Sequence, residues 1–252
     1  MQNNLSAIIL TKNEEKNIID CLDSVRFCEE IIVVDDESED RTADLVKNYH
    51  DKKVKFYTRP IENDFSAQRN FSLSKASNEW VLYLDSDERI SANLVFEIQN
   101  AIRNTDTNGF FLKRNDVIWG KQLKFGEAGS MYLLRLARKK AGEWHGKVHE
   151  EWVIDGRVEK LTNPIIHYPH QTLREFLSEI NVYSSLRAEE LYVQNKHSNL
   201  FSIVFYPKAK FFMNYFLKQG FRDGTAGLIF ALMMSFHSFL VRAKLYLIGN
   251  NK

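Results

Sequence analysis

Short apolar runs alternate with helix-like patterns along the first hundred residues. The runs are four to six residues long and end in polar residues, which predicts strands at residues 5–10, 31–34, 54–57 and 80–84. Between them, apolar residues recur at helical spacing near residues 18–25, 43–46 and 65–76, with Asn13 as the expected N-cap of the first helix. Strands that alternate with helices predict βαβ units and a parallel sheet, and unbroken apolar runs predict that both of its faces are covered.

The second half of the chain has a different pattern. Strand-like and loop-like stretches follow one another without crossover helices at residues 109–114, 131–136, 143–152 and 163–170, which predicts mixed or antiparallel pairing. From Thr172 the pattern is helical again, with apolar residues at about helical spacing: Phe176, Ile180, Tyr183, Leu186 and Leu191. We therefore predict an α/β domain at residues 1–170 and a helical extension at residues 171–252.

Polar, acidic segments follow three of the predicted strands, at residues 11–14, 35–40 and 85–88. Because the carboxyl ends of parallel strands lie along one edge of a sheet, we expect these segments to converge on one ligand-binding crevice. The first strand is followed neither by a Gly-rich dinucleotide fingerprint nor by a Walker A sequence. A bound nucleoside phosphate would therefore be held by a metal, by basic side chains and by main-chain groups.

Asp85 and Asp87 flank a single serine at the end of a predicted buried strand. Two carboxylates held this close repel each other, which favours a cation, and oxygen ligands suit Mg²⁺ or Mn²⁺ shared with substrate phosphates. His167, which follows an apolar stretch, is a candidate for a further metal ligand. The alternatives are a solvated turn that caps the next helix and a structural role for the histidine.

Three further ionisable residues are candidates for the site, each with a structural alternative. Arg69 opens a predicted helix and can bind phosphate with its forked guanidinium, or it is a surface arginine. Asp36 can accept a hydrogen bond from a base or a ribose hydroxyl, or it caps a helix. Glu14 is equally ambiguous, because negative charge is also favourable near a helix N-terminus.

Glu150 is the candidate general base. It lies in a polar cluster flanked by Trp144 and Trp152. A base needs a partly dry place near a substrate hydroxyl, and the two indoles could provide both a dry surface and a face on which a sugar stacks. The alternative is a polar pair of strands at a solvated edge of the sheet.

Composition narrows the class of protein. The chain of 252 residues is 44% apolar, as in globular proteins, and its 34 Lys and Arg against 33 Asp and Glu give no argument for a nucleic-acid partner. Cys21 and Cys28 complete no zinc pattern, which predicts reduced structural thiols in a cytoplasmic protein. Residues 1–12 run into the first strand without a charged leader, so we expect no signal peptide.

Together these motifs resemble family 2 glycosyltransferases of the GT-A fold over about residues 5–170. The motifs, in matching order and spacing, are IILTKNE at 8–14, VVDDESED at 33–40, QRN at 68–70 and LDSDE at 84–88. Residues 148–150, 166–168 and 220–224 look most like the bacterial enzymes that add a hexose to the lipopolysaccharide inner core, the β-1,4-glucosyltransferase type. The resemblance implies an α/β fold of the GT-A class, a Rossmann-like sheet that binds nucleotide-diphospho-sugars, with a C-terminal helical extension.

The resemblance also implies a reaction and a donor site. The reaction is inverting transfer of one hexose from a nucleotide sugar, most often a UDP-hexose such as UDP-glucose, to a cell-envelope glycan or glycolipid acceptor such as lipopolysaccharide core. By the same resemblance Thr11, Glu14 and Asp36 hold the uridine. Arg69 is expected near the diphosphate, and Asp85 near the ribose and the metal.

The remaining roles implied by the resemblance are those of metal ligand and base. Asp87 and His167 would bind a divalent Mg²⁺ or Mn²⁺, and Glu150 would be the catalytic base. The chain departs from the family pattern at Glu37, where glycine is frequent, and at Glu151, which could be the base instead. The Gln-x-x-Arg-Trp motif of processive synthases does not follow, which favours addition of a single sugar.

Three other functions remain open from the sequence. A sugar-nucleotide nucleotidyltransferase would need a Gly-rich loop where residues 11–14 stand. A phosphatase of the haloacid-dehalogenase type would carry Asp-x-Asp after its first strand rather than its fourth. A non-catalytic carbohydrate-binding module would not require the complete set of acids.

The C-terminal region combines apolar runs with basic residues. Its most apolar run, residues 228–234, stops near His237 and Arg242, short of the ~20 residues that a membrane span needs. The basic flanks predict an interfacial helix pair in peripheral contact with the inner face of the cytoplasmic membrane, where a lipid-linked acceptor would be found. The alternatives are packing on the catalytic domain and a homodimer interface.

Overall fold

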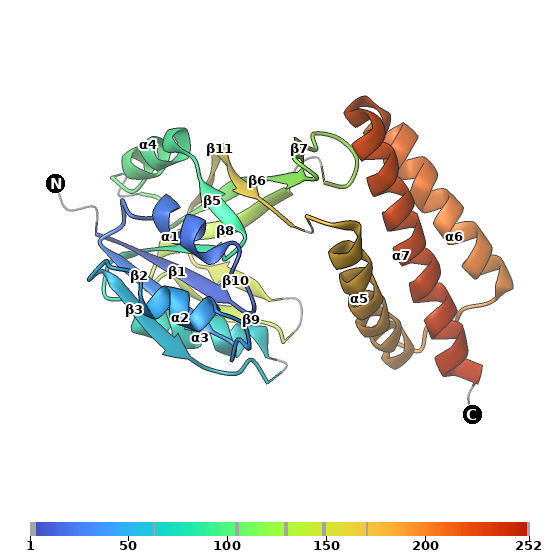
Figure 1. Ribbon diagram of the computed structural model, residues 1–252, viewed down its shortest axis with the longest axis horizontal. Helices are drawn as coiled ribbons and strands as arrows, with labels where there is room; N and C mark the ends of the chain where they lie inside the picture. The colour runs from blue at the N-terminus through green and yellow to red at the C-terminus, as the bar shows by residue number, and fades with distance from the viewer. Residues whose placement is uncertain are drawn as a thin grey trace. The chain divides into compact units, whose positions relative to one another are not determined.

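The chain forms two units in this computed structural model, which describes residues 4–62, 64–103, 106–128, 131–147, 150–169 and 171–250 (Figure 1). The sheet unit comprises Met1–Arg114 and Met131–His167, and the helical unit comprises Asn115–Ser130 and Tyr168–Lys252. Residues 115–130, which the sequence places in the first domain, are assigned to the helical unit. The physical reason is that main-chain N–H groups of this segment bind Asp223.

Four parallel strands form the first half of the sheet, in the order β3-β2-β1-β4. They are β1 (Leu5–Thr11), β2 (Glu30–Asp35), β3 (Val54–Thr58) and β4 (Trp80–Asp85). Four helices accompany them: α1 (Ile18–Ser24), α2 (Thr42–Lys47), α3 (Phe65–Lys75) and α4 (Ala92–Ala101). The predicted βαβ arrangement and the parallel sheet are therefore confirmed.

The second half of the sheet has mixed pairing, as predicted. β8 (Met131–Arg138) runs antiparallel to β4, and β6 (Gly109–Ile118) runs antiparallel to β8. β11 (Val158–His167) follows, and β5 (Glu88–Ile90) pairs antiparallel with it. β7 (Lys121–Gln122) pairs with β6, while β9 (Gly142–His145) and β10 (Glu151–Ile154) form a separate hairpin. The sequence did not predict β5, which is only three residues long and begins with a charged residue.

Apolar side chains of the parallel strands point alternately to two cores, one on each face of the sheet. Ile9 and Leu84 pack with α1 and α4, whereas Ile8 and Tyr83 pack with α3 and the β9–β10 hairpin. Burial on both faces explains the unbroken apolar runs and confirms that prediction. Cys21 and Cys28 are buried free thiols.

The start of α1 differs from the prediction. The helix begins at Ile18 with Asn17 at the N-cap, and Asn13 lies in the preceding loop. Asn13 has a positive φ of 55°, a left-handed conformation that asparagine tolerates better than most residues. Its side-chain oxygen accepts from the N–H of Glu39 at 2.8 Å. Asn13 therefore joins the first acidic segment to the second and does not cap the helix.

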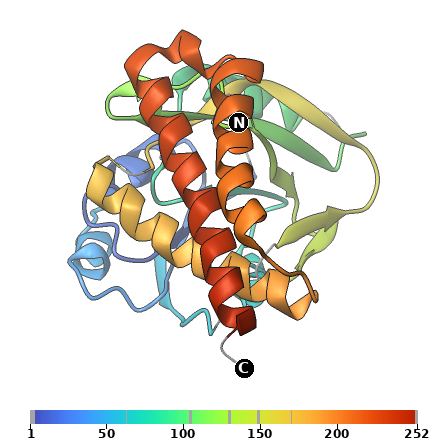
Figure 2. The ribbon, with the colours of Figure 1, turned by 90° about the vertical axis from the view of Figure 1, so that its right-hand side faces the viewer.

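The helical unit contains α5 (Leu173–Val193), α6 (Leu200–Phe212) and α7 (Gly224–Asn250). α5 starts with a capping box formed by Thr172 and Glu175. α6 continues through a π-helical turn, η1 (Met213–Leu217), and reaches α7 by a 3₁₀ turn, η2 (Gly220–Asp223). Figure 2 shows α6 in orange lying along α7 in red.

The length of α7 corrects one expectation. The apolar run at 228–234 does not end the segment, because the helix continues through His237 and Arg242 and is 27 residues long. By length and composition alone, Gly220–Asn250 could cross a membrane. In α5, Phe176 and Ile180 are buried as the periodicity suggested, but Tyr183 is exposed.

Candidate functional site

The carboxyl ends of β1, β2 and β4 lie side by side, as predicted. In the two ladders Thr11 pairs with Asp35, and Leu10 pairs with Asp85. The N–H of Asp36 donates to the carbonyl of Thr11 at 2.9 Å. The three polar segments therefore form one continuous edge of the sheet.

Three predicted nucleoside contacts lie at the β1–β2 end of this edge. Asp36 accepts from Lys12 Nζ at 2.7 Å and, through its other oxygen, from a main-chain N–H at 2.8 Å. Glu14 Oε2 accepts from Asn17 Nδ2 at 2.7 Å. Thr11 is buried, and its hydroxyl has no hydrogen-bond partner within the described part of the chain. Asp36 would have to release the half-exposed Lys12 before its Oδ2 could bind a ligand.

Two arginines hold the first aspartate of the Asp-Ser-Asp segment. Arg135 Nη2 lies 2.5 Å from Asp85 Oδ2, and Arg69 Nη2 lies 3.4 Å from Asp85 Oδ1. Burial alone would raise the pKa of the Asp85 carboxyl, but the two guanidinium charges outweigh it and hold that pKa well below its usual range. Asp85 is therefore an ionised partner of arginines, and it is less available than Asp87 as a direct metal ligand.

Glu88 contacts both the main chain of Asp85 and the side chain of Arg135. Its Oε2 accepts from the N–H of Asp85 at 3.0 Å, and its Oε1 lies 3.7 Å from Arg135 Nη2. Burial raises the pKa of the Glu88 carboxyl, although Arg135 opposes the change. The sequence reasoning assigned no role to Glu88 or Arg135. The available signal was a charged residue inside the apolar strand at residues 131–138, which is unfavourable unless the charge is paired.

Asp87 and His167, the two predicted metal ligands, lie together. His167 Nε2 is 3.1 Å from Asp87 Oδ2, and the pairing of β5 with β11 sets His167 opposite Glu88. A carboxylate oxygen and an imidazole nitrogen fit a divalent cation whose other ligands are water and substrate phosphate. Across the described residues, no group of three or more His, Cys, Asp or Glu is arranged to hold a metal. The pair could therefore supply two ligands to a divalent cation, and the remaining ligands would have to come from water or from a bound molecule.

Glu150, the predicted base, is bound to the same cluster. Arg69 Nε lies 3.0 Å from Glu150 Oε1, so one guanidinium contacts both Glu150 and Asp85. The main-chain carbonyl of Arg69 accepts from the hydroxyl of Tyr83 at 2.8 Å, which fixes the backbone of the arginine against β4. Glu151 is exposed on β10, opposite His145. Of the two acids, only Glu150 contacts the arginine cluster; Val148 and His149 lie outside the described residues.

The two tryptophans that flank Glu150 in sequence are core residues. Trp144 and Trp152 stack on each other at 5.3 Å, and both meet the Tyr83 ring edge-on at 5.0 Å. Their exposed fractions are 6% and 5%, so the prediction that they offer a sugar a stacking face is wrong. They do cover one side of the arginine cluster with apolar surface, because the Arg69 guanidinium lies 4.6 Å from the Trp144 ring.

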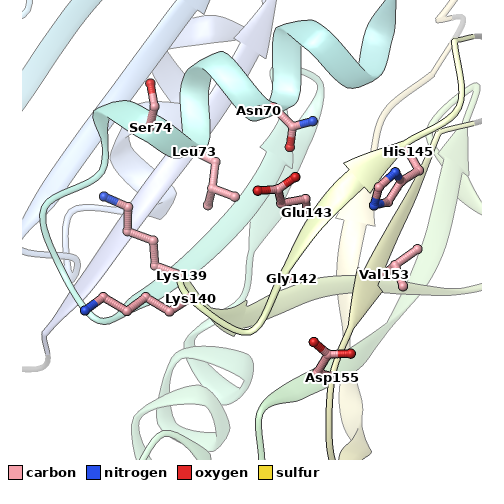
Figure 3. Close-up of a pocket in the computed structure, with 10 residues that line it drawn as sticks. All are labelled: Asn70, Leu73, Ser74, Lys139, Lys140, Gly142, Glu143, His145, Val153 and Asp155. Carbon is pink, nitrogen blue, oxygen red and sulfur yellow. The ribbon is translucent and has the colours of Figure 1, made fainter.

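A hollow of about 670 Å³ lies elsewhere in the sheet unit, between α3 and the β9–β10 hairpin (Figure 3). Its lining residues include none of the predicted site residues: Asn70, Leu73, Ser74, Lys139, Lys140, Gly142, Glu143, His145, Val153 and Asp155. Lys139 binds the carbonyl of Ala76, before the start of β4, whereas Asp85 is at the other end of that strand. We therefore place the chemistry at the Asp85 edge and not in this hollow.

Replacing Arg135 by methionine is expected to lower the free energy of unfolding by about 3 kcal/mol, because the fully buried Glu88 and the partly exposed Asp85 lose the buried guanidinium beside both of them. That figure is at the lower end for such changes, since Arg69 still faces Asp85. Denaturant unfolding measures the loss. The control is Arg157→Met, whose 64% exposed side chain pairs with Glu159 at the surface. This control should lose about 1 kcal/mol or less, and equal losses in the two variants would contradict the special place of Arg135.

Comparison with known proteins adds three findings. The model of the family described as "Glycosyl transferase family 2" matches residues 6–165. The lipopolysaccharide core biosynthesis glycosyltransferase LpsC of Rhizobium meliloti is 30% identical over 248 residues, which cover 96% of this chain and 92% of the relative. An uncharacterized glycosyltransferase of Rickettsia typhi is 28% identical over 96% of this chain and 86% of its own length.

A solved structure is similar in fold. The mannosyltransferase PcManGT from Pyrobaculum calidifontis, in complex with GDP-Man and Mn²⁺, aligns with a TM-score of 0.53 at 11% identity. The alignment covers 99% of this chain and 88% of the mannosyltransferase. At this identity the likeness concerns the fold alone.

Proposed function

Because the chain belongs to glycosyl transferase family 2, we propose that it moves one hexose, with inversion, from a UDP-glucose-type donor to a cell-envelope glycan or glycolipid. The protein is a glycosyltransferase with a GT-A fold, as the sequence predicted. The observation that carries the finer proposal is the convergence of two pairs on one sheet edge: Asp87 with His167, and Arg69 with Glu150.

The donor is proposed to lie along the edge formed by β1, β2 and β4. Thr11, Glu14 and Asp36 would hold the nucleoside, which the adjacent ends of β1 and β2 support, since Thr11 pairs with Asp35 there. Arg69 would face the diphosphate, and Asp85 the ribose. A guanidinium shared between carboxylates is well suited to a diphosphate, because the phosphate oxygens can replace the carboxylate oxygens at the same N–H groups.

The acceptor class rests on the relatives rather than on geometry. LpsC, which this chain matches over almost its whole length, is named for lipopolysaccharide core biosynthesis. We propose an acceptor of that kind, a sugar hydroxyl on a cell-envelope glycan or glycolipid such as lipopolysaccharide core. An acceptor anchored in lipid would bring the enzyme to the inner face of the cytoplasmic membrane.

The proposed chemistry is a single displacement. Glu150 accepts the proton of the acceptor hydroxyl while the hydroxyl oxygen bonds to the anomeric carbon, and the bond from that carbon to the diphosphate breaks with its electrons going to the diphosphate. Arg69 contributes positive charge beside the leaving group. A divalent cation held by Asp87 and His167 would supply further positive charge there.

The position of Arg69 suggests how the base is released. Arg69 contacts both Glu150 and Asp85. Arg135 lies closer to Asp85 than Arg69 does, so Asp85 stays paired if Arg69 turns toward a diphosphate. Such a turn would leave Glu150 free to accept a proton. The donor is therefore proposed to bind before the acceptor can react.

A thermal-shift panel tests the proposed function. UDP-sugars with Mn²⁺, at about 100 times their Kd, should raise the Tm by about 5–10 °C, because a ligand that binds only the folded state stabilises it. The shift should disappear with EDTA and be smaller with sugar nucleotides of other bases. Indifference to every nucleotide sugar, with and without metal, would remove the basis of the proposal.

A further inference from the structure

Charge is distributed very unevenly along this nearly neutral chain. Residues 191–252 contain eight of the 34 basic residues and a single acidic residue, Asp223. The basic residues are Lys196, Lys208, Lys210, Lys218, Arg222, Arg242, Lys244 and Lys252. Asp223 is buried and bound to main-chain N–H groups of Lys124 and Phe125. The last quarter of the chain is therefore strongly positive, and its one carboxylate does not face solvent.

The same segment exposes an unusual amount of apolar surface. No residue of α6 is buried, although the helix packs along α7. Phe201 is 68% exposed, Phe205 52% and Leu217 67%. Of the 26 large hydrophobic residues that are exposed among the described residues, 16 lie in this segment. Exposed apolar side chains that gather on one segment mark a surface that a partner is expected to cover.

The end of α6 is rigidly supported. Residues 212–222, which we call the aromatic tip, expose Phe212, Phe216 and Phe221. The tip is tied to the segment 121–128 because the N–H of Gly126 donates to the carbonyl of Lys218 at 2.9 Å.

Two further contacts hold the aromatic tip in place. Lys210 pairs with Glu127 at 2.6 Å. A Cβ built on Gly227 would lie 2.0 Å from the carbonyl oxygen of Gly220, so α7 starts in close contact with η2 and only glycine fits there. Residues 220–224 therefore hold the start of α7 and residues 124–125 together. The backbone of the aromatic tip is fixed by these contacts, and its aromatic side chains extend from that backbone.

We propose that α6 and the aromatic tip insert shallowly into an anionic lipid surface. Aromatic and aliphatic side chains would enter the acyl boundary, and Lys208, Lys218 and Arg222 would reach the headgroups. This inference rests on the proposed function only for the location of the acceptor at a membrane. The positive charge of residues 191–252 and the exposed apolar side chains of α6 do not depend on that function.

Other partners fit this face less well. In a symmetric dimer the same face would meet itself, so the positive charges would repel each other. A nucleic acid would match the charge but leave the exposed phenylalanine and leucine side chains without an apolar partner. α7 is long enough to span a bilayer, but it serves as the support for α6, since Ser235 Oγ donates to the carbonyl of Pro207 at 2.8 Å.

The test is flotation of the full chain with vesicles of phosphatidylcholine, with or without phosphatidylglycerol. We expect binding that needs phosphatidylglycerol, falls with salt and is reversed by alkaline carbonate. The double variant Phe216→Ser with Leu217→Ser should lower the partition coefficient at least tenfold, and Lys208→Glu with Lys218→Glu by about tenfold or more at low salt. The controls are Phe96→Ser, which removes a 69% exposed phenylalanine of the sheet unit, and Lys140→Glu. Both should bind as the parent does.

Several results would overturn the proposal. These are unchanged binding by both double variants, equal binding to neutral vesicles, resistance to carbonate, or a parent dimer that the tip variants dissociate. The nucleotide thermal shift, measured without vesicles, separates this outcome from the proposed function. A tip variant that loses vesicle binding and keeps the donor shift supports the lipid surface, whereas loss of the donor shift in the parent affects only the proposed function.

Discussion

Glu150→Gln is expected to lower kcat by about 10²–10⁴-fold, because an amide cannot accept the proton of the acceptor hydroxyl. The KM for the donor should stay the same or fall, since a neutral amide holds Arg69 less strongly than a carboxylate does and so competes less with the diphosphate. Steady-state transfer assays over a range of donor concentrations separate the two parameters.

Glu151→Gln is the matched control for this substitution. Glu151 is adjacent in sequence but exposed on β10, away from the arginine cluster. Its variant should retain near-normal kcat. If the loss appeared in Glu151→Gln and not in Glu150→Gln, the two acids would exchange roles.

Asp87→Ala is expected to lower kcat by about 10²–10³-fold, because the charge that stabilises the leaving diphosphate would no longer be held in place. The variant should also lose the metal-dependent part of the nucleotide thermal shift, while its unfolding in the absence of ligand stays close to that of the parent. The readouts are a transfer assay and a Mn²⁺ titration followed by Tm.

Asp20→Ala is the control for lost charge, since Asp20 is an exposed acid of the same unit. It should leave turnover and metal response unchanged. Normal turnover in Asp87→Ala with an unaltered metal requirement would show that the cation is held by other groups.

Three strands of the parallel half, β1, β2 and β4, could be predicted because they are buried on both faces. Such strands show unbroken apolar runs, as in residues 80–84, which stand out from polar loops in any sequence. β5 carries no such signal, because Glu88 and Arg89 belong to a strand that exists only through its pairing with β11. The predicted ligand His167 lies beside Asp87 through this unpredicted strand.

In the candidate site, too, some residues could be predicted from the sequence and others could not. Acids at the ends of predicted strands could be located from the sequence, since topology alone brings strand ends together. The partners of those acids could not. Arg135 comes from a distant antiparallel strand, and Trp144 and Trp152 looked like a sugar platform because a sequence does not show which face of a hairpin is covered.

The helical extension was underestimated for a different reason. The apolar run ends near His237 and Arg242, but charged residues do not stop a helix as glycine or proline does. The basic residues of this region are visible in the sequence and predict the interfacial helices, although the whole-chain charge totals nearly cancel.

The short ladder between β5 and β11 fixes which face of the sheet the two proposed cation ligands share. Side chains alternate between the faces of a sheet, so one residue inserted within residues 165–167 would turn the imidazole of His167 away from Asp87. Insertions in the turn at residues 155–157, before β11 begins, would leave the ladder and the imidazole in place. Related chains can therefore differ in the length of that turn, whereas the number of residues in β11 that pair with β5, up to and including His167, has to stay fixed.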